Sequence, residues 1–231
     1  MGRFFDSEGP IMSFLTRAAD IMLLNILTCI CCLPVITAGA AFTALHYMSL
    51  KLVRGEETYI IKGYFKSFKQ NFKQATIIWL LIVLVAAIFV GDYVIIQYTQ
   101  LEIPKLVTIV LIALGIIFLL AVVYIFPVLA KFDNTVFNTI KNAALISFIS
   151  LPRAILMLVF YVIPVAVSLF APAFLPVVFL FGFSLPAYLA AMLYSSVLKR
   201  FEPQEEKKHA DSWVVPDTVG LVNQEEKKDE Q

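Results

Sequence analysis

Residues 154–198 read AILMLVFYVIPVAVSLFAPAFLPVVFLFGFSLPAYLAAMLYSSVL, a run of forty-five positions without a charged side chain. A helix needs about 20 apolar residues to cross the hydrocarbon core of a bilayer, so this run is long enough for two. The prolines of Ala171–Pro176 predict the turn between them, because proline breaks or kinks helices. The run therefore predicts a helical hairpin within a membrane.

Three further charge-free tracts precede this one. They contain thirty, eighteen and twenty-five residues and are Ile21–Leu50, Gln74–Gly91 and Leu106–Ala130. The tracts are apolar throughout instead of alternating in polarity, which favours helices over a β-barrel. Leu33–Gly39 interrupts the first tract with proline, threonine and glycine. We therefore expect one helix over residues 12–33 and a second over residues 37–54.

Together the tracts predict an all-α polytopic membrane protein with six transmembrane helices. The count falls to five if residues 37–54 form a re-entrant helix that does not cross. The other spans are expected near 75–97, 106–130, 153–171 and 175–198. The composition agrees, because 60% of the residues are hydrophobic and 15% are charged. A soluble domain is nearer half apolar and a quarter charged, so a soluble globular enzyme is excluded.

Lysine and arginine concentrate between alternate tracts, in 51–73, in 131–153 and at Lys199–Arg200. Such residues favour the cytoplasmic side, so these segments are expected there, and an even number of spans places the N-terminus there as well. Residues 202–231 carry nine acidic and four basic residues. They predict a flexible acidic cytoplasmic tail that follows a transmembrane domain of residues 1–201.

The cytoplasmic segment Ile60–Lys73 has a helical pattern of its own. Phenylalanines and lysines repeat at helical spacing in two stripes about a quarter-turn apart. These residues are Lys62, Phe65, Lys66, Phe68, Lys69, Phe72 and Lys73. The pattern predicts an amphipathic helix that lies on an anionic membrane surface and anchors the next span. The alternative that it also docks a partner protein stays open.

Five polar residues near the membrane tracts are candidates for structural or functional roles. Arg17 and Asp20 are three residues apart and can share a helix face, and Asn25 extends this polar strip inward. Asp133 and Asn134, with the threonine that follows, offer capping groups for a helix that begins there and runs into the next span.

The sequence contains no pattern typical of catalysis, of a cofactor site or of nucleic-acid recognition. Cys29, Cys31 and Cys32 lie in an apolar helix with His46 as the nearest imidazole. A structural zinc site needs four suitably spaced ligands, so these thiols are interpreted as small apolar packing groups. We therefore expect no enzyme, no cofactor, no metal and no nucleic-acid partner.

Several runs together resemble the YesL family of small bacterial membrane proteins. They are ADIMLLNIL at 19–27, LPVITAG at 33–39, TALHY at 43–47, LVRGEE at 52–57 and FKSFKQNF at 65–72. That family has no characterised function, and its members tend to be encoded beside sugar ABC importers. The resemblance therefore implies a bacterial plasma-membrane protein with an auxiliary role in carbohydrate uptake, and it brings no catalytic or ligand residues.

The leading hypothesis is a non-enzymatic accessory or regulatory subunit that binds the permease subunits of a bacterial carbohydrate ABC importer within the lipid bilayer, as a hetero-oligomer. The alternative is a stand-alone transporter or channel for a small solute, in which the prolines break helices around a site near the bilayer midplane.

Overall fold

A computed structural model describes residues 10–56, 59–99 and 104–201 of the chain. These residues form helices and contain no strand, which confirms the all-α prediction. The acidic tail predicted at 202–231 lies outside the described residues. The chain divides into two units, Met1–Ser196 and Val197–Gln231, and the contacts below all lie within the first.

The first apolar tract folds as two helices, as predicted. α1 (Pro10–Cys32) is followed by the short 3-10 helix η2 (Val35–Thr37) and by α2 (Ala38–Arg54). Pro34 adopts an extended conformation ahead of η2, where it lacks the N–H that a continuing helix would need. α2 ends at Gly55, whose φ of 71° is the left-handed conformation that glycine adopts without strain.

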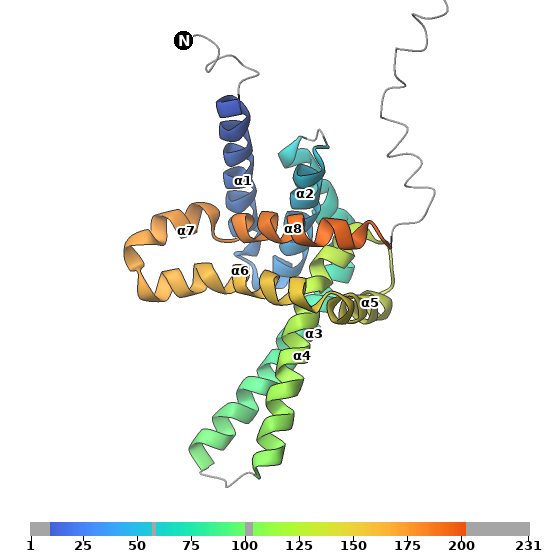
Figure 1. Ribbon diagram of the computed structural model, residues 1–231, viewed down its shortest axis with the longest axis vertical. Coiled ribbons are helices and arrows are strands. Elements are labelled where there is room, and N and C mark those ends of the chain that lie inside the picture. Colours follow the sequence, from blue (N-terminus) through green and yellow to red (C-terminus); the bar gives the residue numbers. More distant parts are fainter. Residues whose placement is uncertain (1–9, 57–58, 100–103, 202–231) are drawn as a thin grey trace, which may run out of the picture. The chain divides into compact units, whose positions relative to one another are not determined.

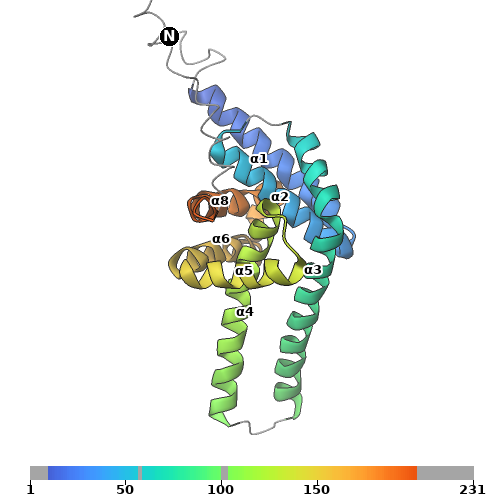
Figure 2. The same cartoon turned by 90° about the vertical axis from the view of Figure 1, so that its right-hand side faces the viewer.

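α3 (Ile60–Thr99) and α4 (Lys105–Lys131) form an antiparallel hairpin (Figure 1 and Figure 2). α3 contains 40 residues, so it is about 60 Å long. The prediction that residues 60–73 form a separate surface helix is wrong, because they are the first turns of α3. No proline interrupts residues 60–99, so nothing breaks the helical hydrogen bonding before the span expected near 75–97.

The described residues after α4 form one long α-helix, three shorter α-helices and one 3-10 helix. A helix was expected to begin near residue 135 and to run into the next span, but it ends at Ile149. The following helix starts at Leu151 with Pro152 in its first turn, a position that suits proline. The elements are α5 (Val136–Ile149), α6 (Leu151–Phe170), the 3-10 helix η3 (Pro172–Phe174), α7 (Leu175–Phe181) and α8 (Ser184–Leu198).

The span expected at 175–198 is also interrupted. α7 and α8 are bent by 58° at a short break that contains Gly182 and Phe183. α6 and α8 lie side by side and run across the direction of α3 and α4 (Figure 1 and Figure 2). The two halves of the charge-free run 154–198 thus turn back on each other as predicted, but the second half consists of two helices.

Within the described residues, four helices are long and apolar enough to cross a membrane, namely α1, α3, α4 and α6. The bent pair of α7 and α8 adds a fifth if it counts as one span. α2, with 17 residues, is not among them. These helices indicate a membrane protein. Their number falls short of the expected six, and it agrees with the alternative of five only if the bent pair is one span.

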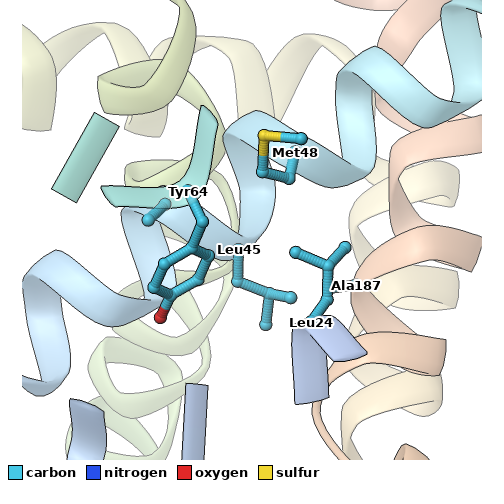
Figure 3. Packing of buried hydrophobic residues seen from close by; sticks show 6 residues of the cluster. Leu24, Leu45, Met48, Tyr64 and Ala187 are labelled. Carbon is cyan, nitrogen blue, oxygen red and sulfur yellow. The ribbon is translucent and has the colours of Figure 1, made fainter. Parts of the chain in front are cut away.

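α2 is the inner helix of this arrangement. Most of its side chains between Ala38 and Leu50 are buried, and it packs against α1, α3 and α4. One buried cluster joins four helices (Figure 3) and consists of Leu24, Ala44, Leu45, Met48, Tyr64 and Ala187. A Cβ atom on Gly39 would lie only 2.5 Å from the carbonyl oxygen of Ala75. Small residues therefore let α2 and α3 approach closely.

Candidate functional site

Arg17 lies in α1 and its side chain reaches the end of α2. Its Nη1 donates a hydrogen bond to the carbonyl oxygen of Leu52 and another, at 3.5 Å, to the hydroxyl of Tyr188 in α8. The last carbonyls of a helix lack partners and carry partial negative charge, so a guanidinium stabilises them. Among the described residues no ion pair joins Arg17 to Asp20. Arg17 thus contacts the end of α2, and it also interacts electrostatically with Asp20, the residue that its spacing suggested.

Asn25 is fully buried and holds the break between α7 and α8. Its Nδ2 donates to the carbonyl oxygen of Phe179 at 2.7 Å. Its Oδ1 accepts from the backbone N–H groups of Phe183 and Ser184, at 2.8 and 2.9 Å. The first N–H groups of a helix have no partner within it, so Asn25 supplies the cap that α8 needs.

His46 forms a buried polar cluster that the sequence did not predict. It lies in α2, and it is within 3.3 Å of the hydroxyl groups of Tyr194 in α8 and Tyr161 in α6. Tyr194 also donates to the backbone carbonyl of His46 at 3.2 Å. The tyrosines are 115 and 148 residues away in the chain, so helix periodicity gave no signal for the cluster.

A neutral imidazole can satisfy all of the contacts of His46. If Tyr194 donates its single hydrogen to the carbonyl oxygen, its hydroxyl oxygen can accept from Nδ1–H. Nε2 can then accept from the hydroxyl of Tyr161. Both ring nitrogens have a hydrogen-bond partner in this arrangement. The cluster joins α2 to α6 and α8, and it presents no nucleophile or carboxylate.

The phenylalanines and lysines at 62–73 occupy two sides of α3. Tyr64 and Ser67 are buried against the other helices, whereas Lys62, Lys66, Lys69 and Lys73 are exposed on the far side. Phe65, Phe68 and Phe72 lie between these two faces, and their rings contact one another in a row. The predicted stripes are therefore present, and their role at a membrane surface stays a prediction.

An open groove runs beside these stripes, between α1 and the first turns of α3. It has a volume of about 890 Å³ and brings Asp20 and Leu23 of α1 to the start of α3. The α3 side and the residue before it contribute Tyr59, Ile60, Ile61, Lys62, Phe65, Lys66 and Lys69. Asp20, which sequence spacing linked to Arg17, therefore faces three lysines across a groove.

Asp133 and Asn134 do not cap α5. The cap is Thr135, whose hydroxyl oxygen accepts from the N–H of Asn138 at 3.4 Å. The carbonyl oxygen of Asn134 accepts instead from the side chain of Gln74 in α3, at 2.5 Å. Gln74 also donates to the hydroxyl of Thr139 at 3.2 Å, so this contact ties the α4–α5 connection to α3.

A second groove, of about 620 Å³, separates α3 from α4 toward the tip of the hairpin. Its walls are mainly apolar and include the neighbouring rings of Phe89 and Phe118, whose centres are 6.0 Å apart. Asp92, Thr108 and Gly115 lie among these apolar residues. Asp92 lies in the last third of α3, and nothing in the sequence of that helix indicated the groove.

The cysteines of α1 are free thiols. Cys29 accepts a hydrogen bond from Asn25 at 3.6 Å, so it belongs to the packing around that side chain. In the part of the chain that the structure describes, no group of three or more histidine, cysteine, aspartate and glutamate side chains is placed to hold a metal ion.

One segment of the chain matches a known protein family. A family model described as "Protein of unknown function, DUF624" matches residues 21–93. The match covers less than half of the chain, from the apolar part of α1 through η2 and α2 to Tyr93 of α3. It is compatible with the resemblance to the YesL family and contains Asn25, His46 and the lysines of α3. Neither the curated proteins nor the solved structures contain a match.

Proposed function

We propose that this chain is a non-enzymatic accessory subunit of another integral membrane protein, and that the α3–α4 hairpin is the surface that binds it. The observation that carries the proposal is the groove in which Asp92, Thr108 and Gly115 lie among apolar side chains. Lipid tails are as apolar as leucine, so helices in a bilayer associate through close packing at small residues and through hydrogen bonds. The groove offers both features.

The hairpin around the groove presents apolar side chains to its surroundings. Exposed examples are Leu84, Ile88, Val90, Ile109, Ile112 and Ile116. Lipid alone satisfies such residues, but it offers no specific donor to a carboxylate. A carboxylate near the membrane core is costly unless it is paired or solvated. A partner helix with a basic or hydroxyl side chain opposite Asp92 would fill the groove and provide that donor.

The class of partner follows from the YesL resemblance. We assign it to the permease subunits of a bacterial carbohydrate ABC importer, in the plasma membrane. The C-terminus of this chain lies in the cytoplasm, and the N-terminus lies there as well if α2 crosses the membrane as a sixth span. The competing function is a stand-alone transporter or channel for a small solute, which would act without a second protein.

A pair of matched variants tests the docking surface. Ile112 lines the groove, whereas Ile117 lies on the opposite side of α4, and both are exposed isoleucines. Affinity purification of the tagged full-length chain in mild detergent should recover importer permeases or their ATPase. Ile112→Trp blocks the groove and should reduce that recovery at least tenfold, whereas Ile117→Trp should leave it unchanged.

Three results would contradict the proposal. Recovery of this chain alone as a homo-oligomer would remove the accessory role. Equal recovery with both tryptophan variants would show that the groove is not the docking surface. Solute uptake by vesicles that contain the purified chain and no other protein would support the transporter instead.

A further inference from the structure

The groove between α1 and the start of α3 combines charge with apolar surface. Lys62, Lys66 and Lys69 lie along one wall, and Asp20 lies on the other. The three lysines make no ion pair among the described residues, and the groove carries a net formal charge of +2. An anion entering it would therefore meet cations that are not already neutralised.

The apolar part of the groove indicates that the anion is an amphiphile. Leu23, Ile61 and Phe65 line it together with the charged groups. Leu23 belongs to the charge-free tract of α1, which begins directly after Asp20, and the lysines lie 5 to 12 residues before the charge-free tract of α3. The groove thus lies where two apolar tracts begin, at the level of the headgroups if those tracts cross a bilayer. Its volume of about 890 Å³ is within the range of small-molecule sites.

Asp20 narrows the choice of headgroup. As a carboxylate it accepts hydrogen bonds and donates none, so it would repel a phosphate oxygen placed against it. It would instead accept from a hydroxyl group of the same headgroup. The net positive charge favours a ligand with net negative charge over a zwitterionic one. A headgroup that carries one phosphate and free hydroxyl groups satisfies both walls.

We propose that this groove binds one anionic phospholipid with a hydroxylated headgroup, such as phosphatidylglycerol. Its phosphate lies against Lys62, Lys66 and Lys69, its headgroup hydroxyls donate to Asp20, and the start of its acyl chains lies along Leu23 and Phe65. The site does not depend on the α3–α4 groove or on any protein partner. In this proposal, the lysine stripe of α3 belongs to a defined lipid site and does not act only through general attraction to the membrane.

Native mass spectrometry of the detergent-purified full-length chain tests this site with dioleoylphosphatidylglycerol as the probe. One bound lipid should be retained, and dioleoylphosphatidylcholine should bind at least tenfold more weakly. A lysine near an anionic lipid contributes enough to change affinity about fivefold, so Lys66→Gln and Lys69→Gln should each weaken binding by about that factor. Lys73→Gln is the matched control, because Lys73 is exposed on the same helix but does not line the groove.

Asp20→Asn tests the second wall. The unmodified chain should prefer phosphatidylglycerol to phosphatidic acid, whose headgroup lacks the hydroxyl groups. The asparagine side chain can donate to a phosphate oxygen, so the variant should lose or reverse this preference while it still binds anionic lipid. The mutated side chains are exposed or half-buried, and an unchanged melting temperature will show that each variant is folded.

Several outcomes would overturn the proposal. Equal weakening by Lys73→Gln would indicate general electrostatic attraction without a site. If phosphatidylcholine bound as tightly as phosphatidylglycerol, the groove would not select lipids by their charge. Displacement of the bound lipid by an equal concentration of free glycerol 1-phosphate would show that the groove serves a soluble phosphate. None of these results bears on recovery of a permease through the α3–α4 hairpin.

Discussion

At the scale of single residues, buried polar side chains join helices that are distant in the chain. Asn25 holds three backbone groups at the α7–α8 break, and His46 joins two tyrosines. A backbone group without a partner costs much more in an apolar surrounding than in water. Asn25 therefore allows an apolar helix to break at a point where lipid could not provide hydrogen-bond partners for the backbone groups.

The role of Asn25 is tested by Asn25→Ala. The substitution leaves one carbonyl and two N–H groups without their partner, and each costs about 1–3 kcal/mol. We expect the free energy of unfolding in detergent to fall by at least about 2 kcal/mol, as measured by thermal or denaturant unfolding.

Asn71→Ala is the control, because the side chain of Asn71 donates its hydrogen bonds to Ser67 of its own helix. Its effect should stay below about 1 kcal/mol, since alanine is the better helix former. Equal losses for the two variants would mean that the bonds to the break contribute no special stability.

At the scale of helices, the length of a helix does not predict how much of it is buried. α2 is shorter than the four candidate spans, yet it is the helix whose side chains are most consistently buried. Its small residues allow close approach, as the contact between Gly39 and Ala75 illustrates. α3 is longer than a bilayer requires, and its polar first turns continue directly into its apolar part.

The continuity of α3 predicts a distance between two exposed positions. Lys66→Cys and Ile88→Cys place spin labels 22 residues apart and on nearly the same side of the helix. One continuous helix predicts a separation of about 33 Å between the backbone positions, whereas a right-angled elbow near residue 74 predicts about 24 Å. Pulsed electron paramagnetic resonance distinguishes the two, and the shorter distance would restore the separate surface helix.

At the scale of the whole molecule, the distribution of lysine and arginine predicts which segments share a side of the membrane. Lys66 and Lys141 belong to the two basic segments, and Lys105 lies at the opposite end of α3 and α4. Because each of these helices is long and apolar enough to cross once, the tip of the hairpin should face away from the cytoplasm.

Cysteine labelling tests this topology in a background in which the three native cysteines are replaced by alanine. Lys105→Cys should react with a membrane-impermeant maleimide in intact cells. Lys66→Cys and Lys141→Cys should react only after permeabilisation. If Lys66→Cys and Lys105→Cys reacted from the same side, α3 would not cross the membrane.

Much of the secondary structure could be predicted from local signals. The break at Leu33–Gly39 and the end of α2 follow from proline and glycine, whose backbone properties act locally. The break between α7 and α8 and the end of α5 at Ile149 were missed. The first depends on a side chain in α1, and an asparagine more than 150 residues away leaves no mark on the local pattern.

The candidate site residues also divide into those that local sequence indicated and those that depend on distant contacts. Arg17 and Asn25 were recognised as polar groups in an apolar helix, but their spacing gave no sign of the hydrogen bonds that Arg17 donates to Leu52 and Tyr188. Asp133, Asn134 and the threonine that follows them were expected to offer capping groups, and of these Thr135 provides the cap. His46 became informative only when α6 and α8 brought two tyrosines to it.

The sequence by itself determined the helical membrane class, because 60% apolar composition and long charge-free tracts leave a helix as the simplest way to satisfy every backbone group in lipid. It also determined the two stripes of α3, since helical periodicity is a local property. Only the tertiary structure decided that α2 is the inner helix, that Asn25 holds a distant break, and that Asp20 faces three lysines. These features depend on which helices pack together, and apolar tracts of similar composition do not specify their own neighbours.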